Sequence, residues 1–132
     1  MGKLFNISEA SSMAIHSLAI IAKSKVQLNA KHISEMTNYS KNHLSKVLQR
    51  LVKYNLIKSE RGPKGGFVLK MESKEINLLE IYEIMEGKLE AEKCNLHSGR
   101  CDFKVCILGG MAEKFTIEFK DYLKNKTLYD LI

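Results

Sequence analysis

Two short helices separated by only three residues are expected in the first half of the chain. Residues 30–36 form the first helix, with Ile33 and Met36 spaced to face a core. Residues 37–39 form the turn, because the asparagine in Thr-Asn-Tyr tolerates the left-handed backbone that such a corner often requires. Ser40 then caps a longer helix over residues 41–54. This arrangement is typical of a helix-turn-helix.

The longer helix has two faces of opposite character. Its inner face is apolar at three- and four-residue spacing, with Leu44, Val47, Leu48, Leu51 and Val52. Its outer face is polar and basic, with Lys41, Asn42, His43, Ser45, Lys46, Gln49, Arg50 and Lys53. A helix that enters the major groove of DNA presents such a face.

A tight hairpin follows the helix pair. Two strands are expected over residues 56–59 and 66–70, and the connection between them is rich in glycine and contains Pro63. The tip of the hairpin carries Arg61 and Lys64, as expected of a wing that reaches a phosphate backbone or minor groove. The fold class predicted is therefore mainly α with a small β-hairpin, a winged helix-turn-helix.

The charge is divided between two parts of the chain. The net charge is +6, but residues 23–70 hold eleven Lys or Arg against two acids, a balance of +9. From residue 71 onward nine bases meet twelve acids, a balance of −3. The first part is therefore suited to a polyanion, while the second is left for another role.

Three further helices complete the expected fold. Ser8 caps a helix that continues to residue 23, with Glu9 in its first turn, where the helix dipole favours an acid. Residues 76–85 form another helix. The last, residues 111–124, is amphipathic and long for what remains to pack against it, which indicates a dimerisation helix. We expect a DNA-binding domain over residues 1–75, and a cysteine-containing loop with a dimerisation helix over residues 76–132.

All three cysteines lie in one short loop. Cys94, Cys101 and Cys106 occur as Cys-x6-Cys-x4-Cys between two predicted helices. Thiolates are soft ligands, and three in a short loop can surround one metal or cluster. The spacing is not that of a zinc ribbon, which needs two Cys-x2-Cys pairs. Unligated thiols or a redox pair are the alternative interpretation.

Several other classes of protein are disfavoured. The chain begins without a secretory signal and has no apolar run long enough to span a bilayer, so the cytoplasm is the expected location. An enzyme is not expected, because no nucleophile–base pair, phosphate-binding loop or paired carboxylates can be identified. A small electron carrier would have no use for the basic helix-turn-helix.

The stretch HISEMTNYSKNHLSKVLQRLVKYNLIKSERGPKGGFVL resembles the Rrf-type family of bacterial winged-helix regulators. The RGPKGGF segment, followed by a helix such as INLLEIYEIMEG, is characteristic of that family. The three-cysteine loop and the tail TLYDLI resemble most closely its iron–sulphur members, the types called IscR, NsrR and RirA.

The resemblance implies a homodimer that binds a palindromic site in double-stranded DNA and holds an iron–sulphur cluster. It implies that Cys94, Cys101 and Cys106 are metal ligands, and that Glu9, donated by the other subunit, is the fourth. The IscR type uses a histidine where this chain has Gly109, which favours a 4Fe-4S over a 2Fe-2S cluster. His97 and His32 are weaker candidates for the fourth ligand, and His16 is interpreted as structural.

The predicted contacts to DNA follow the docking of the motif. Lys41, Asn42, His43, Ser45 and Lys46 would reach base edges, while Arg50, Lys53, Arg61 and Lys64 would meet phosphates. Loss, oxidation or nitrosylation of the cluster would alter the spacing of the two DNA-binding heads. The alternative is a regulator of the same fold that senses by cysteine oxidation or through a partner protein, without a cluster.

Overall fold

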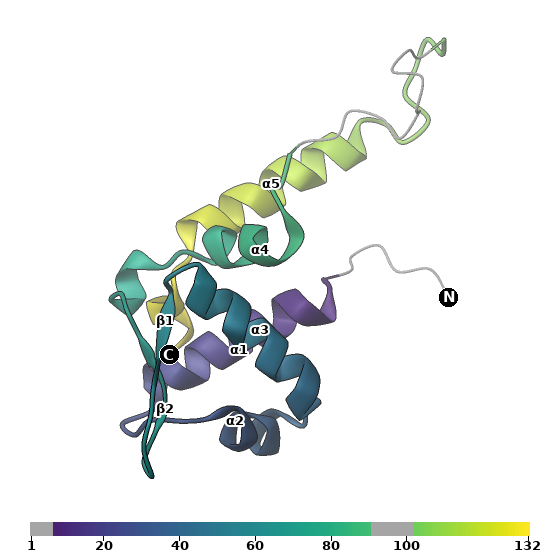
Figure 1. Cartoon of the computed structure of the whole chain (residues 1–132). Coiled ribbons are helices and arrows are strands. Elements are labelled where there is room, and N and C mark those ends of the chain that lie inside the picture. Colours follow the sequence, from purple (N-terminus) through teal and green to yellow (C-terminus); the bar gives the residue numbers. More distant parts are fainter. Residues whose placement is uncertain (1–6, 91–101) are drawn as a thin grey trace.

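The computed structural model describes residues 7–90 and 102–132 of the chain. Its elements follow one another as α1 (Glu9–Lys23), α2 (Ala30–Thr37), α3 (Lys41–Lys53), β1 (Ile57–Glu60), β2 (Gly66–Leu69), the 3-10 turn η1 (Ser73–Glu75), α4 (Leu78–Glu86), α5 (Met111–Asn125) and the 3-10 turn η2 (Leu128–Leu131). Figure 1 shows the helices stacked beside a single hairpin. The predicted fold class, mainly α with a small hairpin, is confirmed. No helix in the described part of the chain is long and apolar enough to cross a membrane.

The helix ends are set by the side chains that the sequence indicated. Ser8 accepts a hydrogen bond from the backbone N–H of Ser11 at the start of α1, and Ser40 accepts one from His43 at the start of α3. Asn38 closes α2 in the left-handed conformation, with a φ of 62°. Such caps satisfy backbone groups that a helix end leaves unpaired. The corner between α2 and α3 is therefore the predicted turn.

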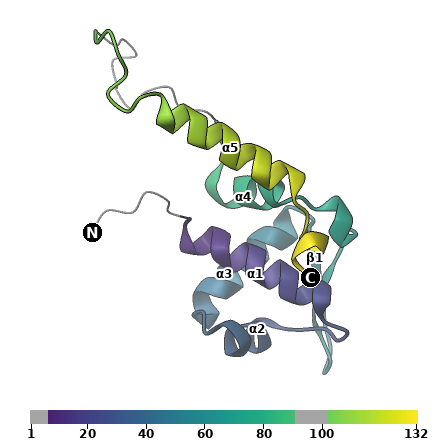
Figure 2. The ribbon, with the colours of Figure 1, turned by 180° about the vertical axis from the view of Figure 1, so that it is seen from behind.

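One hydrophobic core joins α1, α3 and α4. Fully buried side chains come from each of these helices, and they include Met13, Leu18, Leu44, Leu48, Leu51 and Ile81. The chain's last turn, η2, adds Leu128 to the same core. In Figure 2, seen from behind, α1 lies in the middle of the molecule, with η2 beside it. The core thus contains residues from both predicted domains, 1–75 and 76–132. The boundary between these domains stays a prediction about function.

The second strand of the hairpin also pairs with the chain that precedes α2, near the turn end of the strands. The two strands themselves pair antiparallel, from Ile57 opposite Leu69 to Glu60 opposite Gly66. The Phe67 N–H also donates to the carbonyl of Leu28 at 2.8 Å. A Cβ at Gly66 would lie 2.6 Å from the Leu28 backbone, so this approach requires glycine.

α4 begins two residues later than predicted, because its first residues pair with the end of the chain. Asn77 forms a bridge with Thr127, and the Leu78 N–H donates to the Lys126 carbonyl at 2.9 Å. This pairing keeps residues 76 and 77 extended, and the Asn77 side chain caps the helix that follows.

α5 extends away from the body of the molecule in both ribbon views (Figures 1 and 2). Near its C-terminal half it packs on α4, where the rings of Tyr82 and Phe119 meet edge to face with centroids 5.5 Å apart. Leu123 is buried in the core, but Met111, Phe115 and Tyr122 are exposed. The predicted amphipathic helix is present, and an apolar part of its surface is uncovered in one protomer.

Candidate nucleic-acid interface and cysteine loop

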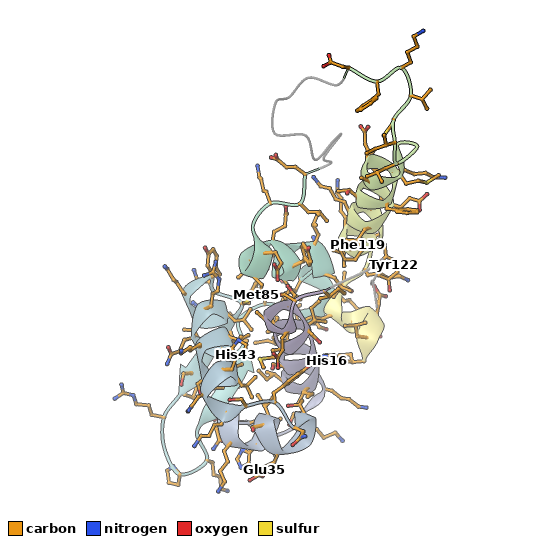
Figure 3. The ribbon with its side chains drawn as sticks, turned by 90° about the vertical axis from the view of Figure 1, so that its right-hand side faces the viewer. His16, Glu35, His43, Met85, Phe119 and Tyr122 are labelled. Atoms are coloured by element: carbon orange, nitrogen blue, oxygen red, sulfur yellow. The ribbon has the colours of Figure 1, made fainter. Side chains whose placement is uncertain are left out.

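The outer face of α3 presents polar and basic side chains to solvent. Seven of the predicted DNA-binding residues are exposed there, namely Lys41, Asn42, His43, Lys46, Gln49, Arg50 and Lys53. Ser45 is half-buried, and its hydroxyl donates to the Lys41 carbonyl at 2.8 Å, within the helix. Figure 3 shows α3 at the side of the molecule away from α5, with His43 labelled on it. The helix therefore offers a continuous donor-rich surface.

Arg50 has a different environment from its neighbours on α3. Its Nε donates to the carbonyl oxygen of Ile84 in α4 at 2.7 Å, and its guanidinium lies 5.6 Å from the centroid of the Tyr54 ring. A charge-assisted hydrogen bond of this kind is stronger than one between neutral groups. Arg50 thus contacts α4 through Nε although the residue is exposed, and its predicted phosphate contact stays a prediction.

The wing carries its two predicted cations at the tip. Arg61 and Lys64 are both exposed, and the turn between them is closed by a hydrogen bond from the Gly65 N–H to the Gly62 carbonyl at 2.9 Å. Among residues 7–90 and 102–132, neither side chain forms an ion pair; Lys58 and Glu60 on the strand do, at 3.5 Å. Both cations are therefore available to a phosphate.

A shallow groove separates the wing from the start of α2, a feature that sequence patterns did not predict. Lys64 and Pro63 line one side, while Asn29 and His32 line the other. His32 is already engaged, because its Nδ1 accepts a hydrogen bond from the Asn29 N–H in the capping box of α2. Because its Nδ1 takes part in capping α2, His32 is a less suitable candidate for a metal ligand.

Of the three predicted cysteine ligands, Cys106 lies within the described residues, while Cys94, Cys101 and also His97 lie outside them. Cys106 is exposed and begins a turn in which the Gly109 N–H donates to its carbonyl at 2.9 Å. Gly109 and Gly110 both have a positive φ, of 62° and 72°, which glycine adopts without strain. Hydrogen bonds from the backbone N–H of Gly110 and then of Leu108 hold the pKa of the Cys106 thiol below its ordinary value. The turn favours thiolate, the form that binds metals and reacts with oxidants.

Glu9 lies exposed in the first turn of α1, next to a carboxylate from another helix. The hydroxyl groups of Ser8 and Ser11 both donate to Oε1 of Glu86, the latter at 2.7 Å. Glu86 therefore adds a second carboxylate, besides Glu9, at the N-terminal end of α1, where the helix dipole favours acids. Within the described ranges, no three His, Cys, Asp or Glu side chains gather as a metal site would require.

Comparisons with known proteins agree with this geometry. Residues 7–132 match the family described as Rrf2, iron-dependent transcriptional regulator. The chain is 32% identical to the transcriptional regulator NsrR of Shouchella clausii, over 87% of this chain and 78% of that protein. It is 27% identical to the regulator IscR of Sodalis glossinidius, over 76% of this chain and 61% of that protein. The fold is similar to that of CymR, the global cysteine regulator of B. subtilis, with a TM-score of 0.81, 24% identity and coverage of 97% and 96% of the two chains.

Proposed function

The chain belongs to the Rrf2 family of transcriptional regulators, and we propose that this member is a homodimer that senses through an iron–sulphur cluster. The proposal is supported above all by two features that occur together in one small fold. A basic helix and wing face outward, while an exposed thiol, Cys106, lies in a backbone turn that favours thiolate.

The DNA-binding step is assigned to α3 and the wing. With α3 in the major groove, its first turns, with Lys41, Asn42 and His43, would meet base edges. Lys53 and the wing cations Arg61 and Lys64 would meet phosphates on either side, releasing counterions on binding. Two such heads related by dimer symmetry would recognise the two halves of a palindromic site.

The sensing step is assigned to the cysteine loop. Cys94, Cys101 and Cys106 would hold the cluster, with Glu9 of the partner subunit as the fourth ligand. The residue chemistry fits, because Cys106 is a soft thiolate donor and Glu9 is an exposed carboxylate. When bound, a cluster supplies a centre that responds to redox change, nitric oxide or iron supply. The four-iron type is favoured over the two-iron type, since Gly109 stands where a histidine ligand would be needed.

The dimer is assigned to α5. Met111, Phe115 and Tyr122 recur at helical spacing along one side of this helix, and all three are exposed. An apolar stripe of this kind is typical of a face that a second subunit covers.

Sensing by thiol oxidation is the second candidate, and the Cys106 turn supports it as well. An exposed thiol with a lowered pKa is more reactive toward oxidants than an ordinary cysteine. This mode requires no metal. The two candidates differ in whether the purified protein contains iron and sulphide.

Anaerobic purification with iron and sulphide analysis and a visible absorption spectrum tests the proposal. We expect a brown protein with about four irons per monomer. Cys106→Ser and Glu9→Ala should each lower the iron content or change the spectrum. Glu113→Ala, the control, removes an acid in α5 that is not a proposed ligand, and it should do neither. A colourless, iron-free wild type would contradict cluster sensing and favour the thiol mode.

A further inference from the structure

The last turn of α4 contacts α3 through one arginine. Arg50 leaves α3, lies against the ring of Tyr54, and donates from Nε to the carbonyl of Ile84 at 2.7 Å. Ile84 lies two residues before the end of α4, where carbonyl groups lack partners within the helix and the dipole attracts a cation. The guanidinium is thus held by a helix end and an aromatic face together.

The same turn fixes the start of the cysteine loop. Gly87 ends α4 with a φ of 89°, and its N–H donates to the Glu83 carbonyl at 2.9 Å. The side chain of Glu83 then accepts the Leu89 N–H at 2.8 Å. The direction in which the loop leaves the helix is therefore set by hydrogen bonds within five residues of Ile84.

The turn also contacts the first helix. Glu86 receives the hydroxyl groups of Ser8 and Ser11 at the start of α1, next to Glu9. Residues 83–86 thereby join three parts of the molecule: the recognition helix α3, the beginning of the cysteine loop, and the end of α1 that carries Glu9. A rigid element that contacts two sites can bias both.

We propose that Arg50 is a positioning residue that couples α3 to the cysteine loop through the last turn of α4, and that it does not act as a phosphate contact. Movement of the loop exit or of the Glu86 contact would displace the Ile84 carbonyl, and Arg50 would carry that displacement to α3. The inference rests on the proposed function, since it concerns how a change in the loop reaches the DNA-binding surface.

The test compares Arg50→Met with Lys53→Met, a matched loss of charge on the same helix. The probe is a DNA duplex selected by the wild-type protein from a random-sequence pool. Its affinity is measured at several salt concentrations for protein purified without oxygen and for the same protein after iron removal by a chelator. For the wild type, the ratio of the two affinities measures the coupling between loop and DNA.

Arg50→Met should reduce this ratio toward one, by roughly 5-fold or more, and leave the salt dependence of binding unchanged. Lys53→Met should weaken both states equally, lower the salt slope by about one, and leave the ratio unchanged. If Arg50→Met instead behaved like Lys53→Met, Arg50 would be a phosphate contact and the inference would be overturned. A wild type with equal affinity in both states would overturn the proposed sensing function and this inference together.

Arg50→Lys provides a second variant that keeps the charge. A lysine has a methylene group where arginine has Nε, so it cannot donate to Ile84 from that position. We expect Arg50→Lys to keep the wild-type salt slope and still lose the coupling. Recovery of the full ratio with lysine would contradict the geometry proposed. Thermal unfolding of each variant checks that the fold is intact.

Discussion

Cys106 illustrates how backbone geometry prepares one side chain for its chemistry. Hydrogen bonds from the backbone N–H groups of Gly110 and then Leu108 lower the pKa of its thiol, and the helix that begins at Met111 adds the positive end of its dipole. A charged thiolate is therefore stabilised although the residue is exposed. The same turn would suit a metal ligand or a reactive thiol.

We expect Cys106 in the iron-free protein to be alkylated with a pH midpoint below that of an ordinary cysteine. Its lowered pKa means that the thiolate persists as the pH falls, until the pH passes the lowered pKa. Iodoacetamide labelling of a Cys94→Ser, Cys101→Ser variant across a pH series measures this. Gly110→Pro, which removes this donor N–H and also cannot adopt the φ of 72° that the turn has there, should raise the midpoint. A midpoint at or above the ordinary value in the parent variant would refute the account of the turn.

Gly66 marks the place where the wing meets the rest of the fold. An alanine there would put its Cβ 2.6 Å from the backbone of Leu28, and neither chain can move without breaking the Phe67–Leu28 hydrogen bond. Gly66→Ala should lower the free energy of unfolding by about 2 kcal/mol, as overpacking does elsewhere. Urea denaturation measures the free energy of unfolding of Gly66→Ala. Ser59→Ala, at an exposed strand position, is the control. Equal stability of the two variants would be inconsistent with the close approach.

The role of a single residue could be predicted from the sequence where its hydrogen-bond partner is only a few residues away. The caps Ser8 and Ser40 and the left-handed Asn38 act within three or four residues, so local patterns contain the necessary information. The roles of Arg50 and Glu86 were not predictable in this way. Their partners lie 34 and 75 residues away, and only the packed fold brings them together.

At the level of elements, α3 and the wing form one cationic surface that local pattern could predict. The alternation of apolar and basic positions in α3, and the glycine-rich connection of the hairpin, correspond to the helix and the turn observed. The start of α4 was predicted two residues early. Its extended entry depends on pairing with Thr127, some fifty residues further along the chain.

Replacing Arg61 and Lys64 together by alanine should weaken DNA binding and flatten its salt dependence. Each lost phosphate contact lowers the slope of log affinity against log salt by about 0.9. The Lys88→Ala variant, at an exposed position beyond α4, should keep the wild-type slope. Titration of a fluorescent duplex at several salt concentrations gives the slopes. An unchanged slope in the double variant would argue against the wing as a phosphate-binding element.

For the whole molecule, the basic and the less basic parts of the chain form two different surfaces. The basic residues gather on the helix-turn-helix and wing, while α5, with its exposed apolar stripe, extends from the opposite side of the body (Figure 3). A chain of this size would leave that stripe exposed unless a second subunit covered it. The cysteine loop, residues 87–110, lies between these two surfaces in sequence.

Phe115→Asp should convert a dimer into a monomer. The substitution places a charge in the exposed apolar stripe of α5, where a partner subunit would have to desolvate it. Lys124→Glu adds an acid to an exposed position of the same helix and should leave the dimer intact. Sedimentation velocity distinguishes the species. A wild type that sediments as a monomer would contradict the assignment of α5.

We expect the state of the cysteine loop to control the binding of DNA by α3 and the wing. The most direct measurement is the affinity of the wild-type protein for its selected duplex, before and after anaerobic iron removal, at one salt concentration. We expect the two affinities to differ by roughly 5-fold or more. Equal affinities, measured on protein shown by analysis to have lost its iron, would contradict it.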